Sequence, residues 1–355
     1  MKGLIGLVAG GKPLSEADAQ AAFDVMMSGD ATPAQIGGFL MALRVRGESV
    51  SEITGAARAM RAKAVAIKAP KGAIDTVGTG GDAAGTFNVS TASAIVVAGC
   101  GVPVAKHGNK AFTSKSGAAD VLAALGVNLD ADFSLVERAL VEANICFMMA
   151  PRHHGAMRHV AGPRVELGTR TIFNILGPIS NPAGVRCQLV GVFSKAWLEP
   201  IATVLGKLGS ERAWIVHGSD GLDEVTLTGP THVAELKDGK VQTFEVSPED
   251  AGLTPCRPDD LKGGDPEENA ATMQALLAGE SGPIRDFVLI NAGASLIIAG
   301  RAADLREGVG LAAQSIDNGK ARAALEKLVA ISNEPMPILE EDAPEDEEDT
   351  RASDA

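Results

Sequence analysis

Short apolar runs of the β-strand type alternate with stretches of helical periodicity from residue 73 onward. The expected strands are 73–77, 102–106, 145–149, 187–193, 213–217 and 287–291. The expected helices begin near residue 88 and lie near 116–125, 133–143, 195–208, 266–277 and 304–316. Such alternation is typical of a mainly parallel sheet with helices on both faces. The sequence therefore predicts an α/β fold with a mainly parallel central sheet, and 232–246, around Asp238-Gly239, predicts an antiparallel hairpin.

Residues 13–66 show a different pattern, in which three amphipathic helices are joined by short turns. Their start signals are Ser15 with Asp18, Thr32 before Pro33, and Ser49 with Glu52. Three short helices bury little surface alone, so they must pack on another surface, for which a second copy of the chain is the expected partner. A polar break follows at 68–72. We therefore predict a small helical N-terminal domain over 1–70, with a role in dimerisation, and a large α/β domain over 71–335.

The net charge of −13 is unevenly distributed. Residues 340–355 hold nine acids and one arginine, a net charge of −8, which leaves −5 for the rest of the chain. A segment of this composition buries little apolar surface, so 336–355 is expected to be a disordered acidic tail. The rest of the chain is acidic and has no basic stripe, which argues against nucleic acid as a partner.

The four cysteines lie far apart and form no C-x-x-C pair. They are Cys100, Cys146, Cys187 and Cys256, and they fit reduced thiols in the cytosol. The longest apolar passage, 287–299, is short and interrupted by Asn291 and Gly293, so no membrane span is expected. The glycine-broken stretch 3–10 has no cleavage-site pattern of a signal peptide. The expected location is therefore cytoplasmic.

A glycine cluster follows the first expected strand of the sheet. Gly78, Gly80 and Gly81 let a ligand approach bare backbone, and 88–91 supplies hydroxyls where an apolar helix begins. A helix N-terminus offers N–H groups and partial positive charge, so a phosphate or diphosphate is the expected occupant. The cluster matches neither a P-loop nor G-x-G-x-x-G, and a plain tight turn is the alternative.

Two further polar segments also follow expected strands. Residues 106–117 place three lysines and three hydroxyls around two glycines, which suits a phosphate nest but also a solvated loop. Residues 220–224 place the adjacent carboxylates of Asp223 and Glu224 in what is by default a surface turn. If a diphosphate binds nearby, paired carboxylates are suitable ligands for its Mg²⁺. Ligands of α/β folds lie beyond the carboxyl ends of the strands, so 78–82, 106–114, 152–154 and 217–224 are expected to converge on one cleft.

Five motifs occur in order along the chain: G-T-G-G-D at 78–82, N-V-S-T at 88–91, K-H-G-N at 106–109, G-P-R-V-E-L-G-T-R-T-I-F-N-I-L-G-P at 162–178, and D-G-L-D-E at 220–224. In combination they resemble the anthranilate phosphoribosyltransferase family of tryptophan biosynthesis, from about residue 5 to about residue 330. The resemblance implies transfer of the phosphoribosyl group of 5-phosphoribosyl 1-diphosphate to the anthranilate amine, with Mg²⁺ as cofactor and a homodimer as the assembly.

The resemblance also implies three sets of site residues. Those that bind the diphosphate sugar are Gly78, Gly81, Asp82, Thr86, Asn88, Val89, Ser90, Thr91, Lys106, His107, Gly108, Asn109, Lys110, Ala111, Phe112, Thr113, Ser114 and Ala118. Those that bind anthranilate are Gly78, Asn109 and Arg164, and the metal ligands are Ser90, Asp223 and Glu224. Lys110 stands where the family usually has arginine, Ala118 where serine is common, and Gly155 where a proline usually follows the histidine pair.

Arg164 also has a simpler interpretation, because an arginine can cap or ion-pair a helix. An aromatic carboxylate needs a planar bidentate partner, which a guanidinium supplies. The segment 170–178 is expected to be a helix followed by a turn that acts as scaffold. His153, His154 and His159 match no common zinc site, and we expect them to line the entrance for the aromatic acid.

The implied reaction requires no side chain as an acid or base, because an aryl amine is neutral at pH 7. Loss of the diphosphate builds negative charge on the leaving group, so stabilisation is expected from Mg²⁺, loop N–H groups and Lys106. One alternative is a pyrimidine nucleoside phosphorylase, against which K-H-G-N and D-G-L-D-E argue. The other is a non-catalytic relative that binds nucleic acid, against which the acidic surface and the carboxylates at 223 and 224 argue.

Overall fold

The N-terminal part of the chain is a group of four helices. The computed structural model describes residues 1–81, 84–111 and 115–335. The helices are α1 (Lys2–Ala9), α2 (Glu16–Met27), α3 (Pro33–Arg46) and α4 (Val50–Ala62). The three predicted helix starts are confirmed, because the side chains of Ser15, Thr32 and Ser49 accept hydrogen bonds from backbone N–H groups in the first turns of α2, α3 and α4. Helix α1 was not predicted, since two glycines interrupt its apolar pattern; it packs on α3.

The central sheet has seven strands in the order β3-β2-β1-β4-β5-β6-β7. They are β1 (Ile74–Gly78), β2 (Val104–Gly108), β3 (Ile145–Met149), β4 (Cys187–Gly191), β5 (Arg212–Gly218), β6 (Thr231–Lys237) and β7 (Lys240–Val246). The first five are parallel, and β6 and β7 form the predicted antiparallel hairpin. Asp238 and Gly239 both have positive φ in its turn. The predicted fold class, a helical N-terminal part and a mainly parallel α/β sheet, is confirmed.

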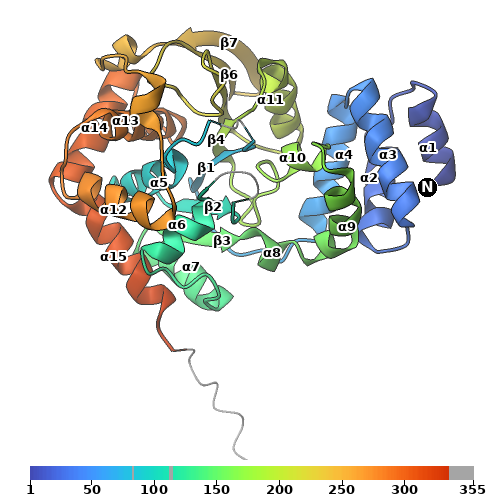
Figure 1. Cartoon of the computed structure of the whole chain (residues 1–355), viewed down its shortest axis with the longest axis horizontal. Helices are drawn as coiled ribbons and strands as arrows, with labels where there is room; N and C mark the ends of the chain where they lie inside the picture. Colours follow the sequence, from blue (N-terminus) through green and yellow to red (C-terminus); the bar gives the residue numbers. More distant parts are fainter. Residues whose placement is uncertain (82–83, 112–114, 336–355) are drawn as a thin grey trace, which may run out of the picture.

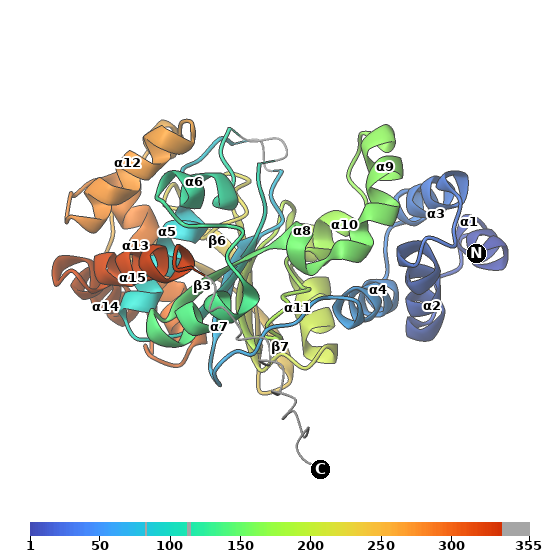
Figure 2. The same ribbon diagram turned by 90° about the horizontal axis from the view of Figure 1, so that it is seen from below.

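Helices cover both faces of this sheet, as Figures 1 and 2 show. Beyond α4 they are α5 (Val89–Gly99), α6 (Ala118–Ala124), α7 (Phe133–Glu142), α8 (Ala150–His153), α9 (Arg158–Leu167), α10 (Phe173–Leu176), α11 (Leu198–Lys207), α12 (Pro266–Leu277), α13 (Pro283–Ile298), α14 (Leu305–Asp317) and α15 (Lys320–Ser332). The six helices predicted after residue 87 correspond to α5, α6, α7, α11, α12 and α14. Helices α9 and α15 were not predicted.

One predicted strand is wrong: residues 287–291 lie inside helix α13. This helix packs against both α5 and α14, and its residues from Phe287 to Leu296 are all buried. A helix that is covered on all sides has no polar face, so its sequence shows a continuous apolar run rather than helical periodicity. A short run of that kind does not distinguish a buried strand from a buried helix.

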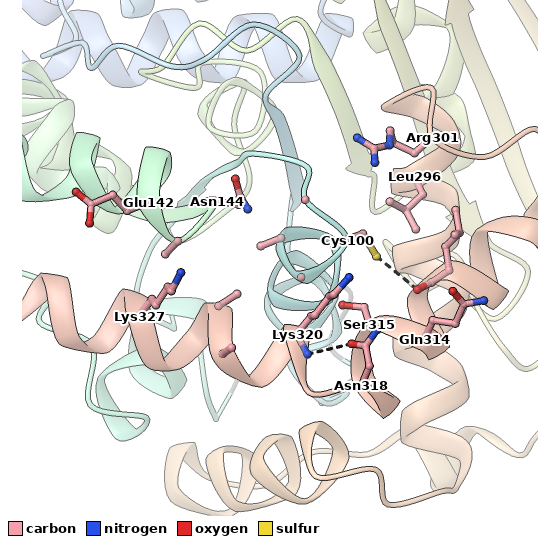
Figure 3. A pocket seen from close by; sticks show the side chains of 17 residues that line it. Cys100, Glu142, Asn144, Leu296, Arg301, Gln314, Ser315, Asn318, Lys320 and Lys327 are labelled. Atoms are coloured by element: carbon pink, nitrogen blue, oxygen red, sulfur yellow. Dashed lines mark hydrogen bonds between the residues drawn. The ribbon is translucent and has the colours of Figure 1, made fainter.

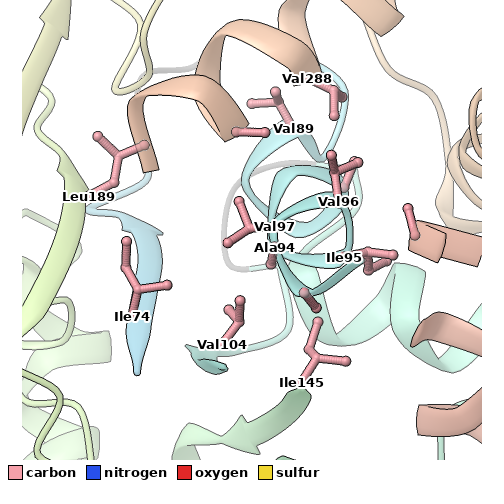
Figure 4. Close-up of a cluster of buried hydrophobic side chains, with 14 of the residues drawn as sticks. Ile74, Val89, Ala94, Ile95, Val96, Val97, Val104, Ile145, Leu189 and Val288 are labelled. Atoms are coloured by element: carbon pink, nitrogen blue, oxygen red, sulfur yellow. The ribbon is translucent and has the colours of Figure 1, made fainter. Parts of the chain in front are cut away.

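Two apolar cores lie on opposite faces of the sheet, because successive strand residues point to opposite sides. Leu189 belongs to the core with α5 and α13, whereas Val190 belongs to the core with α2, α3, α4 and α11. Figure 4 shows α5 with its apolar side chains near Ile74 and Val104 of the strands and near Val288 of α13. In Figure 1 the sheet lies between α1–α4 at one end of the molecule and α12–α15 at the other.

No helix within residues 1–81, 84–111 and 115–335 is long and apolar enough to cross a bilayer. The acidic tail, 336–355, lies outside the described residues, as do 82–83 and 112–114.

Candidate functional site

The parallel strands β1, β2, β4 and β5 all end in glycine, and the segments that follow β1 and β5 meet there. The N–H of Gly80, in the loop after β1, donates a hydrogen bond to Oδ2 of Asp223, at 2.7 Å. A Cβ atom on Gly78 would lie 2.4 Å from that oxygen, and one on Gly191 would lie 1.5 Å from the Asp223 carbonyl oxygen. The glycines are therefore required by the close approach of the 220–224 turn, and Asp223 is buried against the glycine loop.

Lys106 connects this turn to the start of α5. Its Nζ donates to the carbonyl oxygen of Thr76, at 2.7 Å, and to Oγ of Ser90, at 3.4 Å. The hydroxyl of Thr76 in turn donates to the carbonyl oxygen of Ser90, at 2.8 Å. Burial lowers the pKa of the Lys106 ammonium group, and the charges of Asp75 and Glu224 oppose this shift. The structure thus brings Ser90, Lys106 and the two carboxylates to one edge of the sheet.

Two charged side chains, Asp75 and Lys106, are buried beneath this edge. Burial raises the pKa of Asp75 to about 6. The rise is opposed by the charge of Lys106 and by hydrogen bonds from the Asn181 amide, at 2.8 Å, the His107 N–H, at 3.2 Å, and the Thr76 backbone. Sequence analysis did not select Asp75, although a carboxylate inside an apolar strand is an available signal.

The segment after β2 is folded back onto the start of α6. Oδ2 of Asp120 accepts hydrogen bonds from the N–H groups of Ala111, at 2.8 Å, and Gly117, at 2.9 Å. The N–H of Ala119 donates to the Asn109 carbonyl oxygen, at 3.2 Å. A Cβ on Gly117 would lie 2.3 Å from the Ala111 nitrogen. Asp120 therefore fixes the loop that carries Asn109, Lys110 and Ala111.

Part of the predicted loop belongs to the sheet. Lys106, His107 and Gly108 are the last residues of β2, which extends two residues beyond the expected strand. Gly108 lies close to Ala118, the first residue of α6, whose Cβ would be 3.2 Å from a Cβ on Gly108. A longer side chain at 118 would point from α6 toward this strand end. The predicted site residues Asp82, Phe112, Thr113 and Ser114 lie outside the described residues.

Asn88 joins the two predicted phosphate-binding segments. Its amide nitrogen donates to the Ser116 carbonyl oxygen, and the Ser116 hydroxyl donates to the Asn88 amide oxygen, each at 3.1 Å. Asn269 of α12 donates to the same oxygen, at 2.9 Å. Thr86 forms an isolated β-bridge with Lys262. The start of α5, where Val89, Ser90 and Thr91 lie, is therefore held by residues that are distant in sequence. One of them, Asn269, lies in no motif that sequence analysis could have selected.

The two arginines of the 162–178 motif have different surroundings. Arg164, in α9, lies over the ring of Phe173, 5.1 Å from its centroid, and within the described part of the chain it makes no hydrogen bond or ion pair. Arg170 donates a hydrogen bond to the Gly81 carbonyl oxygen and lies over the ring of Phe193, 4.3 Å from its centroid. Arg170, predicted to be scaffold, is thus the arginine that contacts the glycine loop. Among the described residues, Arg164 makes no hydrogen bond to Gly78 or Asn109.

Two histidines, His107 and His154, pack against each other at β2. The rings of His107 and His154 meet edge to face, 5.1 Å apart. Burial lowers the pKa of His154 to about 4 and holds the pKa of His107 well below its usual value. His153 contacts the Val65 carbonyl oxygen at 2.6 Å, and His159 lies beside Gly29, so the three predicted histidines do not converge. Among residues 1–81, 84–111 and 115–335, no group of three or more His, Cys, Asp or Glu side chains could hold a metal ion.

Known proteins are similar to this chain over nearly all of its length. Residues 70–322 match the model of the glycosyl transferase family, a/b domain, and residues 2–64 match the glycosyl transferase family, helical bundle domain. The anthranilate phosphoribosyltransferase of Rhodospirillum rubrum is 64% identical over 335 residues, which cover 94% of this chain and 96% of the relative.

Solved structures of the same name are similar in fold. The crystal structure of anthranilate phosphoribosyltransferase from Thermus thermophilus is 43% identical, with a TM-score of 0.89, and the match covers 93% of this chain and 99% of that chain. The Saccharomyces cerevisiae enzyme in complex with PRPP and Mg is 32% identical, with a TM-score of 0.82, over 90% of this chain and 93% of that chain.

Proposed function

The chain belongs to the anthranilate phosphoribosyltransferase family of glycosyl transferases, and from this premise we propose a role for each part of its site. The proposed reaction joins the anthranilate amine to C1 of 5-phosphoribosyl 1-diphosphate. Its products are N-(5-phosphoribosyl)anthranilate and pyrophosphate, and it is the second step of tryptophan biosynthesis from chorismate. The observation that carries the proposal is the contact of the Gly80 N–H with the Asp223 carboxylate, because it unites the glycine loop with the acidic turn.

The diphosphate sugar is proposed to bind between the glycine loop, the first turn of α5 and the loop that Asp120 fixes. Lys106 has two hydrogen bonds to protein oxygens, to Thr76 and Ser90, so one of its three N–H donors is available to a diphosphate oxygen. The backbone N–H groups around Gly81 and at the α5 N-terminus add further donors. Lys106 is held by these bonds before the ligand arrives, as the stabilisation of a developing charge requires.

Magnesium is the proposed cofactor. Asp223, Glu224 and Ser90 supply hard oxygen ligands, the donor type that Mg²⁺ prefers together with water and phosphate oxygens. The donor set fits, because two adjacent carboxylates stand beside the glycine loop, and a pair of them suffices for an ion that keeps several waters. When bound, Mg²⁺ would neutralise charge on the departing diphosphate.

The aromatic acid is proposed to bind against Gly78, Asn109 and Arg164. Burial lowers the pKa of the Arg164 guanidinium, so a carboxylate there would meet a poorly solvated cation and bind it more strongly. The neutral rings of His107 and His154 suit an uncharged aryl face. The anthranilate amine needs no base, so the protein acts by positioning and electrostatics.

We also propose the organisation predicted from the sequence: a helical domain over 1–70, an α/β domain over 71–335 and a separate tail over 336–355. A homodimer through the helical domain is supported by the exposed apolar side chains of Leu7 in α1 and Val45 in α3. A cytoplasmic location is supported by the four cysteines, all of which are free thiols.

Purified protein with anthranilate, the diphosphate sugar and Mg²⁺ tests the function directly. Anthranilate fluorescence should fall with time and stop falling when EDTA is added or the sugar is omitted. In a parallel reaction, a pyrimidine nucleoside and inorganic phosphate should give no free base. Turnover of the nucleoside without turnover of anthranilate would overturn the proposal in favour of a phosphorylase.

A further inference from the structure

An open cavity lies at the far end of α5 from the proposed diphosphate site. Its volume is about 450 Å³, and it is lined by the end of α5, the α7–β3 connection, the end of α13, and helices α14 and α15. The proposed diphosphate ligands are in the first turn of α5, and the cavity is at its last residues, Ala98 to Gly101. Eleven residues of α-helix span about 16 Å, so the two places are distinct. We name this cavity the α15 pocket.

The α15 pocket carries three basic side chains, Arg301, Lys320 and Lys327. Figure 3 shows Lys320 and Lys327 extending from α15, and Cys100 between Arg301 and Lys320. Burial raises the pKa of the Cys100 thiol, and the charges of Arg301 and Lys320 oppose this rise. These three cations gather on a chain whose net charge is −13, so the bulk charge does not account for them.

The acidic side chains next to the pocket form ion pairs with arginines outside the pocket. Glu142, the one carboxylate in the lining, pairs with Arg138 at 3.4 Å. Asp317 pairs with Arg285 at 2.6 Å, and Glu326, beside Lys327, pairs with Arg322 at 3.4 Å. Within the described part of the chain, the three pocket cations form no ion pair. The α15 pocket therefore keeps an excess of positive charge.

Polar groups without charge complete the lining. Asn144, Gln314 and Asn318 contribute amides, and Ser315 contributes a hydroxyl that already donates to the Val96 carbonyl oxygen, at 2.9 Å. A volume of about 450 Å³ falls within the range of small-molecule sites and exceeds what a single inorganic ion fills. Cations at separated points around such a volume suit a ligand whose negative charges are also separated.

We propose that the α15 pocket binds a small organic anion that carries two or more phosphate or carboxylate groups. The cations hold the charged groups, and the amides bind the polar atoms between them. The site is separate from catalysis, since none of its residues belongs to the proposed diphosphate or anthranilate sites.

Cys100 provides a local measurement of occupancy in the full-length protein. Alkylation by iodoacetamide at pH 8.5, followed by peptide mass spectrometry, is timed with tripolyphosphate or with tricarballylate as the probe, in EDTA. We expect at least one probe to slow alkylation of Cys100 fivefold or more. Cys256, which is also half-buried but lies outside the pocket, is the internal control and should react at an unchanged rate. Protection by one probe alone identifies the group as phosphate or carboxylate.

A pair of charge-matched variants locates the binding. Arg301→Gln, Lys320→Gln and Lys327→Gln together should abolish the protection, while turnover of anthranilate stays at the wild-type rate. Lys12→Gln, Lys237→Gln and Lys240→Gln, at exposed cations elsewhere on the surface, change the net charge equally and should keep the protection. Unchanged Cys100 alkylation with both probes, or equal protection in both triple variants, would overturn the proposal.

Discussion

Gly78→Ala places one methyl group between the glycine loop and the acidic turn. The new Cβ would lie 2.4 Å from Oδ2 of Asp223, and an ordinary contact needs about 3.4 Å, so the carboxylate must move by about 1 Å. It is buried, and it accepts a hydrogen bond from Gly80 at 2.7 Å. A shift of that size breaks the bond, at a cost of about 1.5–3 kcal/mol for a charged acceptor.

The same shift displaces a proposed Mg²⁺ ligand from the diphosphate. Misplacement of catalytic groups by about 1 Å costs on the order of 100-fold in rate, so kcat/KM for the diphosphate sugar should fall by about 10- to 100-fold. The Mg²⁺ concentration for half-maximal rate should rise, while KM for anthranilate changes less. The measurement is initial-rate fluorescence over a matrix of sugar and Mg²⁺ concentrations, with a thermal melt of each variant.

Gly310→Ala is the matched control, because a Cβ at this position in α14 meets nothing within 4 Å. It should retain wild-type kinetics and gain up to about 1 kcal/mol from the better helix propensity of alanine. If folded Gly78→Ala protein shows wild-type Mg²⁺ dependence and kcat/KM, then the position of Asp223 is irrelevant to turnover and the reasoning fails.

The remaining predictions concern five side chains. Asp223→Asn with Glu224→Gln should abolish Mg²⁺-dependent turnover in a protein with a normal melting curve; wild-type metal dependence would return both to a surface-turn role. Arg164→Ala should raise KM for anthranilate by a factor that corresponds to about 2–3 kcal/mol of lost binding free energy. An equal rise in KM for both substrates would refute the carboxylate assignment. Arg170→Met should lower kcat/KM for the sugar about tenfold, with partial rescue by Arg170→Lys if the hydrogen bond to the loop matters; no change would make it scaffold. The pKa of Asp75 is raised to about 6 from 3.8, so its contribution to the free energy of unfolding is present below pH 4 and is lost as the pH rises to 6. In urea unfolding, Asp75→Asn should therefore gain stability relative to wild type as the pH rises from 4 to 6. A difference in unfolding free energy that stays constant over this range would contradict the shift.

Local signals were sufficient for most of the fold. Helix caps such as Thr32 and Ser49 are recognised from the first four residues of the helix that they begin. Strands with one buried face are recognised from the alternation of apolar and polar residues along them. The failure at 287–291 came from tertiary packing, because α13 is covered by α5 and α14, and the sequence does not say which helices will cover which. Helix α15 begins at Lys320, and the preceding N-cap residue is Gly319, which has no side chain to cap the helix, so the usual start signal is absent.

The candidate site also contains residues that local sequence signals identify and residues that only tertiary packing brings in. Glycine loops, the lysine of β2 and adjacent carboxylates stand out by composition, and their convergence follows from the parallel topology. Asn269 and Arg170 do not stand out, because each acts through a partner that is distant in sequence, Asn88 in one case and Gly81 in the other. Such contacts depend on the packing of α12 and of the α9–α10 segment, which no local pattern specifies.

Asp75 and Lys106 are both buried at the base of the proposed site, and the charge of each opposes the effect of burial on the pKa of the other. Burial alone would favour the neutral amine, which could donate to a diphosphate but could not offset its charge. Asp75 supplies the opposing charge, and its own oxygens are held by Asn181 and the His107 N–H, so the carboxylate cannot turn away. Without the Asp75 charge, burial would act on Lys106 with less opposition and would lower the pKa of its ammonium group further. Asp75 thus serves the proposed chemistry without touching a substrate: its charge favours the charged form of Lys106, while hydrogen bonds to Thr76 and Ser90 set the position of the ammonium group.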